Sequence, residues 1–420
     1  MDFYQYRDRE LWCEDVQAAE IAANVGTPAF VYSRATIEYH YDKLTEAFAW
    51  AKPMICYSVK ACANLAVLKV LADKGSGFDV VSAGEIHRAL LAGADPKRIV
   101  FAGVGKTDAE MEYALRTGIH LFTVESEPEL EALNAAAGRL GVKARVALRV
   151  NPDVDPKTHT YISTGKRETK FGIDLERAGR MLARRTDFPH VEFAGVHAHI
   201  GSQITSTAPY VEALTRVARF VDGQERSGLF LESIDIGGGF GIFYKGSEAR
   251  TAEEFAAAVK PIVASLKRSL LMEPGRFIVG NAGILLTRVL FVKDSGEKRF
   301  VIVDAAMNDL IRPALYQAEH RIWPVKAAVL PEEAEGATLP RADIVGPVCE
   351  SGDFLALDRP FPHVTRGELL AVFSAGAYGM TMSSNYNSRL RACEVLVEGK
   401  TFRVVRKRET LDDLTRLETI

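Results

Sequence analysis

The chain has 420 residues and a formal net charge of −3 at pH 7, with 52 lysines and arginines against 55 aspartates and glutamates. This balance argues against nucleic acid or an anionic membrane as the main partner, and no apolar stretch reaches the roughly 20 residues that span a bilayer. The five cysteines are too scattered for a disulfide framework or a zinc ribbon, and the charged N-terminus is unlike a signal peptide. We therefore expect a cytoplasmic protein, with neither nucleic acid nor a membrane as its partner.

Residues 28–280 alternate between short apolar runs and helical patterns. The runs are, in chain order, 53–61, 77–85, 98–106, 120–126, 144–152, 192–203, 231–241 and 269–277. Intervening segments such as ELEALNAAAGRL repeat apolar residues with the period of a helix. The alternation predicts parallel strands joined by crossover helices, and eight such units in about 250 residues predict a closed (β/α)8 TIM barrel. A doubly wound open sheet is the alternative.

After residue 280 the pattern changes to strand-like runs with few helical segments between them. Examples are GILLTRVLFVKDS, KRFVIVDAA, GELLAVFSAG and RACEVLVEGKTFRVV. We expect residues 281–420 to form a C-terminal antiparallel β domain. Residues 1–27 do not follow the alternation of the barrel, and we expect them to join this β domain.

Polar residues stand where the predicted barrel strands end, which is where barrel enzymes carry their functional groups. Lys60 ends the first strand, and the second strand carries Asp79. An amine held in a partly desolvated pocket is nucleophilic, so Lys60 can serve as a Schiff-base lysine for an aldehyde such as pyridoxal phosphate. The alternative is an exposed lysine beside a strand.

The sequence HAH at 197–199 places two imidazoles on one face of the sixth strand. A metal site needs further ligands, and no matching cluster of histidine, cysteine or aspartate is evident in the sequence, so we expect no metal. A planar imidazole stacked on a planar cofactor is the favoured interpretation. Ser202, in the IGSQ that follows, can donate to a phosphate.

The seventh and eighth predicted strands end in glycines and in EPGR. Phosphate sites of barrel enzymes often use the loops at these positions, where backbone N–H groups approach an anion; a tight turn is the alternative for the glycines. Glu273 can keep a pyridine nitrogen protonated, and Arg276 can pair with a phosphate or carboxylate. A surface ion pair is the alternative for EPGR.

Two stretches of the β domain carry polar groups suited to a site. GPVCESGD (346–353) places Cys349 beside Glu350, although a free cysteine is usually a buried apolar residue. GAYGMTMSSNYNSR (376–389) is rich in glycine, serine and asparagine and contains Tyr378. We expect this loop to line a site.

The order of these motifs resembles the diaminopimelate decarboxylases, pyridoxal phosphate enzymes of fold type III with an alanine racemase-like architecture. The motifs are, from about residue 25 to 400, YSVKA, FDVVSAGE, NP, KFG, HIGSQ, DIGGGFG, EPGR, IRPALY, CESGD and YGM…SSNYNSR. The resemblance implies the decarboxylation of meso-2,6-diaminopimelate to L-lysine, the last step of lysine biosynthesis. It also implies a homodimer with shared active sites. Leu390 and Met380 depart from the usual pattern, and neither removes a reacting group.

The resemblance assigns a role to each matching residue. Lys60 would bind the cofactor covalently, and Cys349 would return a proton after CO2 leaves. The residues that would contact the cofactor are Lys60, Asp79, His199, Ser202, Gly237, Gly238, Gly239, Glu273, Gly275, Arg276 and Tyr378. Those that would contact the substrate are Arg276, Arg312, Tyr316, Glu350 and Tyr378. Cys349 and Glu350 would come from the neighbouring subunit.

Three other functions are weighed against this one. A decarboxylase of ornithine, lysine or arginine would typically carry aspartate where this chain has Glu350, and its substrates have no distal carboxylate. A racemase of this fold tends to have an arginine at the position of Glu273. A non-catalytic, regulatory homologue that binds pyridoxal phosphate usually lacks the lysine or the cysteine, and this chain has both Lys60 and Cys349.

Overall fold

The computed structural model describes residues 3–155, 170–244, 249–334 and 338–420. The chain divides into two compact units. The barrel unit comprises His40–Ile242 and Glu248–Phe277, and the β unit comprises Met1–Tyr39, Phe243–Ser247 and Ile278–Ile420. Within the described ranges, no helix combines the length and the apolar character needed to cross a membrane.

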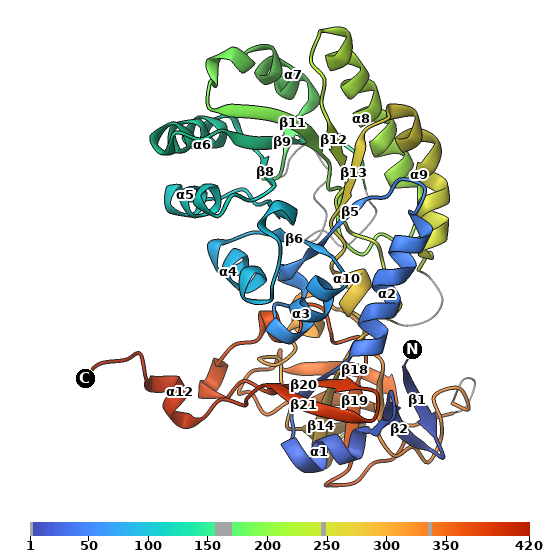
Figure 1. Cartoon of the computed structure of the whole chain (residues 1–420). Helices are drawn as coiled ribbons and strands as arrows, with labels where there is room; N and C mark the ends of the chain where they lie inside the picture. Colours follow the sequence, from blue (N-terminus) through green and yellow to red (C-terminus); the bar gives the residue numbers. More distant parts are fainter. Residues whose placement is uncertain (1–2, 156–169, 245–248, 335–337) are drawn as a thin grey trace. The chain divides into compact units, whose positions relative to one another are not determined.

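Eight parallel strands form the barrel (Figure 1). They are β5 (Met54–Ser58), β6 (Gly77–Val80), β7 (Ile99–Phe101), β8 (Leu121–Val124), β9 (Ala144–Asn151), β11 (Val191–His197), β12 (Ser233–Asp235) and β13 (Ser269–Met272). Each strand pairs with the next, and the pairing of β13 with β5 closes the ring. The two-residue strand β10 (Ile173–Asp174) adds to β9. The predicted (β/α)8 barrel is confirmed.

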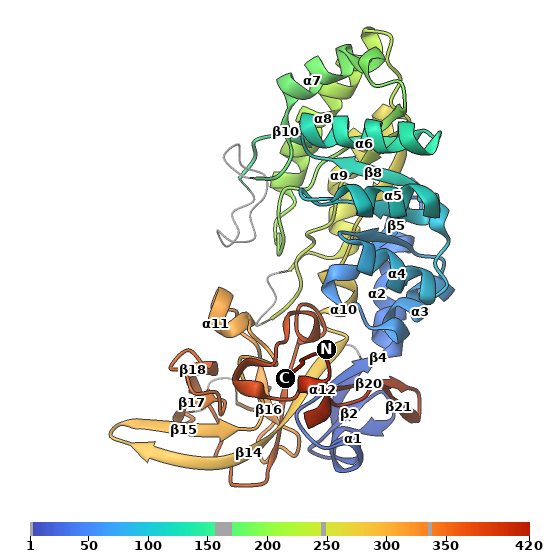
Figure 2. The same cartoon turned by 90° about the vertical axis from the view of Figure 1, so that its left-hand side faces the viewer.

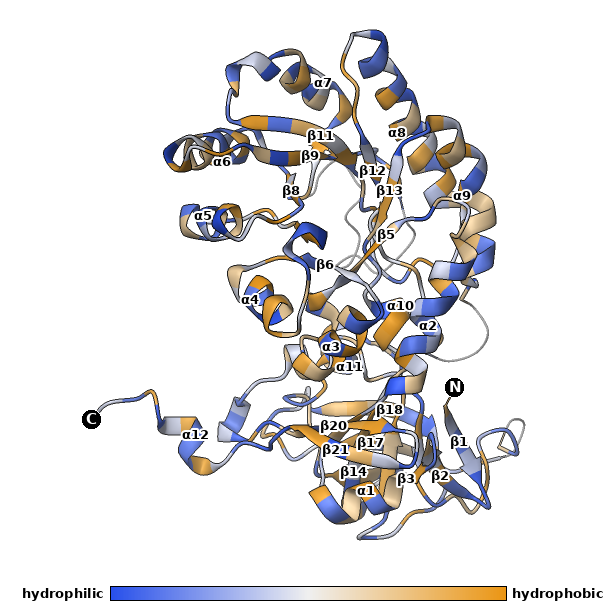
Figure 3. Cartoon of the chain, in the orientation of Figure 1, coloured by the Kyte–Doolittle hydropathy of each residue, from blue (hydrophilic) through white to orange (hydrophobic). Residues whose placement is uncertain are grey.

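Helices surround these strands. They are α2 (Arg34–Ala47), α3 (Leu65–Asp73), α4 (Ala83–Leu91), α5 (Asp108–Thr117), α6 (Glu127–Leu140), α7 (Leu175–Ala183), α8 (Ala208–Arg226), α9 (Ala252–Leu266) and α10 (Arg276–Val279). Those from α3 onward each follow a strand, whereas α2 precedes β5 and begins within the β unit. Capping side chains fix where several of them begin: Thr107 caps α5 and Thr251 caps α9, each in a reciprocal pair with a glutamate three residues later. Figure 3 shows β11 largely apolar and α8 alternating between apolar and polar residues, as an amphipathic helix on a buried strand should.

The barrel interior changes from apolar to polar toward the carboxyl ends of the strands. An apolar layer is formed by Cys56, Val100, Leu121, Ala147, Ala194 and Leu271. Alternate residues of a strand point to the same side, so the residue two positions further on faces the interior above this layer. On four of the strands these residues are Ser58, Thr123, Arg149 and Glu273. The strand period therefore places polar side chains at the mouth of the barrel.

The β unit is built on a nine-stranded mixed sheet. Its strands are β4 (Ala29–Ser33), β14 (Gly283–Ser295), β15 (Lys298–Val303), β16 (Ile322–Pro324), β17 (Arg341–Val345), β18 (Phe354–Pro360), β19 (Leu369–Val372), β20 (Cys393–Glu398) and β21 (Thr401–Arg406). The main path runs β18-β17-β15-β14-β4-β20-β21, with β19 between β14 and β16. Figure 2 shows the long β14–β15 hairpin. The sheet is mainly antiparallel as expected, but β4–β20 and β15–β17 are parallel, because long segments separate these strands in the chain.

The start of the chain also belongs to the β unit. Residues 1–27 contain the small sheet β1 (Tyr4–Arg7), β2 (Glu10–Cys13) and β3 (Val16–Gln17), followed by α1 (Ala18–Val25). Residues 28–39, which the sequence pattern placed in the barrel, lie in the β unit instead, because β4 pairs with β14 and β20. A strand followed by a helix looks like a barrel unit in the sequence, and only its hydrogen-bond partners reveal the difference.

The core of the β unit joins its sheet to these N-terminal elements. The cluster includes Leu11, Ile21, Val31, Leu286 and Val395, all at most 1 % exposed. Two short helices complete the unit, α11 (Arg312–Tyr316) and α12 (Leu411–Thr415). Burial of this apolar area, at roughly 25 cal/mol per Å2, is the main force holding β4 in its place.

Candidate active site

Lys60 lies at the mouth of the barrel beside a buried carboxylate. It occupies a short 3₁₀ turn directly after β5, and its Nζ is 2.5 Å from Oδ2 of Asp79. The hydroxyl of Ser58 donates to the same oxygen at 2.7 Å. Burial and the charge of Glu273 raise the pKa of Asp79, while Lys60 and Ser58 counteract the rise. The side chain of Lys60 is 36 % exposed, so its amine remains accessible from the barrel mouth.

The two histidines of the HAH sequence have parallel rings with different partners. Their ring centroids are 6.4 Å apart at an interplanar angle of 4°. His197 ends β11, and its Nε2 lies 3.0 Å from Oε2 of Glu273. The backbone N–H of Gly238 donates to Nδ1 of His199 at 3.1 Å, so this nitrogen carries no proton. Burial and the charge of Arg149 hold the pKa of His199 well below its ordinary value, in agreement with a neutral ring.

Two further carboxylates surround His197. Glu273 follows β13 and Asp235 ends β12, and both are buried. Burial opposes ionisation of Glu273, but the charge and hydrogen bond of His197 hold its pKa below the ordinary value. Burial and the charge of Glu273 raise the pKa of Asp235 well above its ordinary value. The surroundings therefore shift the pKa values of these two carboxyl groups in opposite directions.

His197, Asp235 and Glu273 each place one potential ligand atom within 4.8 Å of the others. The sequence did not reveal this cluster, because its members come from three different strands. A signal was present: each is a titratable residue within one of the predicted apolar runs, and in the structure each stands at or just after the carboxyl end of its strand. The Nε2 of His197 is already bonded to Glu273, and the absence of a metal remains a prediction.

The glycines after β12 are required by close packing of two loops. A Cβ on Gly238 would lie 2.0 Å from the carbonyl oxygen of Glu273, and one on Gly239 would lie 2.0 Å from that of Gly201. Gly237 has φ 66°, in the left-handed region, and a Cβ there would lie 2.7 Å from Nδ1 of His199. No side chain fits in this turn, so the close packing of these loops requires glycine at all three positions.

Ser202 and Arg276, both expected at a phosphate, are in contact. Nη2 of Arg276 donates to Oγ of Ser202 at 3.0 Å, and Arg276 is 6 % exposed. Gly275 precedes the arginine, and a Cβ there would lie 3.0 Å from that of Ser58. The structure thus brings Ser202, Arg276 and the Gly237–Gly239 turn to the barrel unit's polar end.

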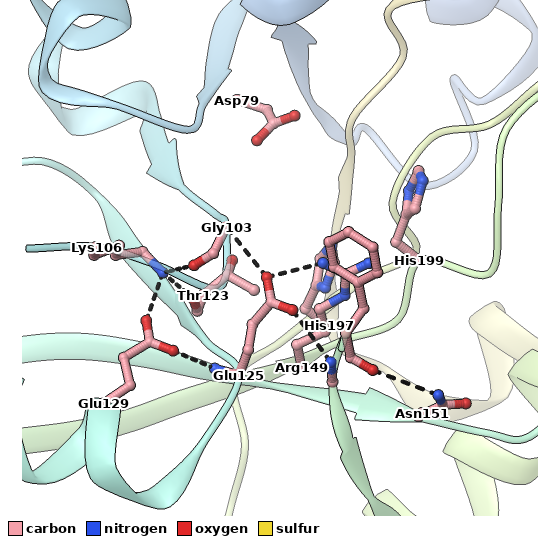
Figure 4. A network of polar contacts seen from close by, with 12 residues as sticks. Asp79, Gly103, Lys106, Thr123, Glu125, Glu129, Arg149, Asn151, His197 and His199 are labelled. Carbon is pink, nitrogen blue, oxygen red and sulfur yellow. Dashed lines mark hydrogen bonds and ion pairs between the residues drawn. The ribbon is translucent and has the colours of Figure 1, made fainter. Parts of the chain in front are cut away.

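A buried ionic network, not anticipated from the sequence, lies at the ends of β7, β8 and β9 (Figure 4). Nζ of Lys106 is 2.6 Å from Oε1 of Glu129, and Nη1 of Arg149 is 2.8 Å from Oε1 of Glu125. All four side chains are at most 8 % exposed. The Arg149 guanidinium lies over the ring of Phe171 at 4.8 Å, and Arg149 is the register partner of His197 on β9. The network fixes a positive charge next to the histidine pair.

Among the predicted substrate residues of the β unit, Arg312 is a buried arginine with aromatic and histidine partners. Arg312 begins α11, the helix that also contains Tyr316, and it is 5 % exposed. Its Nη1 is 2.8 Å from Nε2 of His320, and its guanidinium lies over the ring of Tyr244 at 4.6 Å. Tyr378 has φ 57°, a left-handed conformation that is unusual for a tyrosine. Such a conformation is common at functional loops.

Cys349 and Glu350 lie in an exposed turn that is held by the 376–389 loop. The backbone N–H of Cys349 donates to Oδ1 of Asn387 at 2.8 Å. The hydroxyl of Tyr386 donates to Oε2 of Glu350 at 2.8 Å. The sequence indicated that this loop lines a site, but it did not single out Tyr386 and Asn387. Their adjacency in the NYN sequence was the available signal.

One atom at the barrel mouth points directly to a bound group. Oε1 of Glu273 is buried and has no hydrogen-bond partner within the described part of the chain. A buried carboxylate oxygen without a donor is costly, so a ligand with a ring N–H would satisfy it. Together with an accessible lysine and a side-chain-free turn, this oxygen fits pyridoxal phosphate. The fold and site therefore define a pyridoxal phosphate enzyme of the barrel type.

Comparison with known proteins narrows this class. Residues 34–280 match the family model of the pyridoxal-dependent decarboxylases, pyridoxal binding domain. Diaminopimelate decarboxylase of Pseudomonas aeruginosa is 50 % identical over 420 residues, which are 100 % of this chain and 99 % of that protein. The chain belongs to the diaminopimelate decarboxylase family, and its cofactor is pyridoxal phosphate.

Solved structures give the same result. Diaminopimelate decarboxylase from Helicobacter pylori, complexed with L-lysine, matches with a TM-score of 0.90 and 42 % identity, covering 95 % of this chain and 98 % of that one. The enzyme from M. jannaschi matches with a TM-score of 0.93 and 37 % identity, covering 100 % and 98 %. The alanine racemase-like combination of barrel and β domain is confirmed.

Proposed function

We propose that this chain removes one carboxylate from meso-2,6-diaminopimelate to give L-lysine. The observation that carries the proposal is the pair formed by an accessible Lys60 amine and the buried Glu273, whose carboxylate is bonded to His197, in one barrel mouth. The first can bind an aldehyde cofactor, and the second can keep its ring nitrogen protonated. The full-length relatives named above support the substrate.

The predicted cofactor residues of the barrel unit each have a role in this proposal. Pyridoxal phosphate, when bound, supplies an electron sink for the charge left on the substrate carbon as CO2 departs. Lys60 holds the cofactor, and Asp79 lies in reach of its Nζ to accept or return a proton there. His199, neutral and buried, offers a flat face for the cofactor ring. Ser202, Arg276, Gly275 and the turn Gly237–Gly239 bind the phosphate.

We infer that the substrate's charged ends meet Arg276, Arg312, Tyr316, Glu350 and Tyr378. Diaminopimelate carries an ammonium and a carboxylate at both ends, so its site needs both anionic and cationic partners. Arg312 is buried and held by His320, which suits a fixed partner for a carboxylate. Glu350 is held by Tyr386, which suits a fixed partner for the distal ammonium.

We further propose that Cys349 returns the proton and that it acts in the site of a second copy. Cys349 and Glu350 are exposed in the single chain, as residues that complete a partner's site would be. A homodimer with shared active sites follows from this proposal. A mixture of two inactive variants tests it: Lys60→Ala and Cys349→Ala subunits, refolded together, should recover about a quarter of the activity if each site takes residues from both chains.

The substrate is tested by incubating the protein and pyridoxal phosphate with meso-diaminopimelate, ornithine, lysine and arginine in turn. Release of CO2 and formation of lysine from diaminopimelate alone is the expected result. The Glu350→Gln variant should lose turnover of diaminopimelate while still binding the cofactor, and Glu297→Gln in the exposed β14–β15 turn serves as control. Preferred release of CO2 from ornithine, lysine or arginine would contradict the proposal.

A further inference from the structure

His197 is bonded to the carboxylate that is expected to face the cofactor ring. The Nε2–Oε2 distance is 3.0 Å, and the side chains of His197 and Glu273 are 1 % and 3 % exposed. We propose that His197 is a positioning residue: it holds one oxygen of Glu273 so that the other oxygen is presented to the ring nitrogen of the cofactor. This inference rests on the proposed function, because it requires pyridoxal phosphate at the barrel mouth.

The geometry divides the two oxygens of Glu273 between two tasks. Oε2 accepts the hydrogen bond of His197, while Oε1 is buried and lacks a partner in the described portion of the chain. A carboxylate that is free to rotate would exchange these oxygens. The bond to His197 removes that freedom, since a buried charge-assisted hydrogen bond is among the strongest polar contacts in a protein.

Charged groups around the pair favour its ionic form. Burial works against a charged His197, but Glu273 and Asp235 raise its pKa above the ordinary value, with Arg149 opposing. Asp235 faces His197 from β12 as its register partner. The charge of Lys60 also lowers the pKa of Glu273. Asp79, on β6, carries a further buried carboxyl of this mouth.

His197 is distinct from its neighbour in this respect. The N–H of Gly238 occupies Nδ1 of His199, which leaves that ring neutral and suited to stacking. His197 instead bonds through Nε2 to a carboxylate, and its Nδ1 is buried with no partner in the described ranges. Two parallel imidazoles, two residues apart, thus serve different purposes: one contacts the cofactor, and the other acts through Glu273.

The test compares two substitutions at position 197 in two backgrounds. The side-chain amide of His197→Gln can place an N–H near the position of Nε2, whereas the shorter His197→Asn cannot reach Glu273. Cofactor affinity is measured by titrating the apo-protein with pyridoxal phosphate and following absorbance. We expect His197→Asn to weaken binding about tenfold to a hundredfold and His197→Gln to recover most of the loss. In a Glu273→Gln background, neither change should weaken binding more than about twofold.

The double-mutant comparison separates positioning from a merely structural role. An equal loss from His197→Asn in both backgrounds, or no difference between Gln and Asn, would overturn the inference. Circular dichroism checks folding, and His197→Leu, which also lacks a donor, replaces the Asn variant if that variant does not fold. If wild-type protein binds no pyridoxal phosphate, the proposed function fails. If the wild type binds pyridoxal phosphate but His197→Asn weakens binding equally in both backgrounds, this inference alone fails.

Discussion

Nζ of Lys60 and Oδ2 of Asp79 lie 2.5 Å apart, with Asp79 fully buried and Lys60 about one third exposed. The amine therefore has a fixed direction and an open approach. Replacing Lys60 with alanine should remove the absorbance band of the lysine-bound cofactor and nearly all activity. The measurement is the near-ultraviolet and visible spectrum after dialysis against free cofactor. Lys69→Ala, at an exposed lysine on α3, is the matched control and should keep the band. A band that persists in Lys60→Ala would remove this lysine from its assigned role.

Cys349→Ala should keep the cofactor and lose decarboxylation. The alanine side chain has no proton to return to the substrate carbon, and a positioned proton donor contributes about 10²–10⁴-fold to the rate. Steady-state kinetics should show the loss in kcat, with the cofactor spectrum unchanged. Ser351→Ala, in the same exposed turn, tests whether any change there is harmful. Near-normal turnover in Cys349→Ala would exclude the cysteine as the donor.

Tyr386→Phe should impair binding of diaminopimelate more than its turnover. The change removes one hydrogen bond from Oε2 of Glu350 and leaves Cys349 in place. A net hydrogen-bond contribution of 0.5–1.5 kcal/mol corresponds to a rise in KM of about two- to tenfold. Cofactor affinity should not change, and Tyr113→Phe on α5 is the control. A fall in kcat at unchanged KM would show that Tyr386 does not act through substrate binding.

The sequence correctly predicted the location of those residues whose place follows from their position along a single strand. The period of two and the position of each strand end predicted that Lys60, Asp79 and Glu273 belong to one barrel mouth. It could not show that His197 bonds to Glu273, or that Arg149 reaches Glu125, because these contacts depend on the register between strands. The same limit explains β4: its apolar run and following helix imitate a barrel unit, while its partners β14 and β20 come more than 240 residues later.

The buried carboxyl of Asp309 should make stability depend on pH. Burial raises its pKa to about 7, although the N–H of Ala306 and the charge of Arg389 work against the rise. An unfolded aspartate has a pKa of about 3.9. The folded chain therefore retains a proton between about pH 4 and 7 that the unfolded chain has lost. The contribution of Asp309 to stability is complete below this interval and is lost as pH rises through it, by up to about 1.4 kcal/mol per pH unit.

Asp309→Asn removes this dependence while keeping an oxygen that can accept from Ala306. The free energy of unfolding of the variant minus that of the wild type should rise from pH 5 to 7 and stay constant from pH 7 to 8. Urea denaturation at each pH measures this difference, and Asp412→Asn in the exposed helix α12 is the control. A difference that is constant over this range would mean that Asp309 ionises normally in the folded protein.

Replacing Lys106 alone, which breaks its ion pair with Glu129, should lower the free energy of unfolding more than replacing both residues. Nζ of Lys106 donates to Glu129 and to the carbonyls of Gly103 and Thr123, and the lysine side chain is 1 % exposed. Lys106→Met leaves Glu129 charged and buried without its cation, which should lower the free energy of unfolding by about 3–5 kcal/mol.

A second change distinguishes the lost pair from lost packing. Adding Glu129→Gln to Lys106→Met removes the uncompensated charge and should restore part of the loss, because the amide of glutamine can still accept the N–H of Glu125. Lys69→Met, which breaks an exposed pair with Asp73, should cost less than about 1 kcal/mol. Urea denaturation of the apo-protein measures all three variants. If the double variant is no more stable than Lys106→Met, the uncompensated charge of Glu129 is not what destabilises Lys106→Met, and the loss of the other contacts of Lys106 accounts for the change.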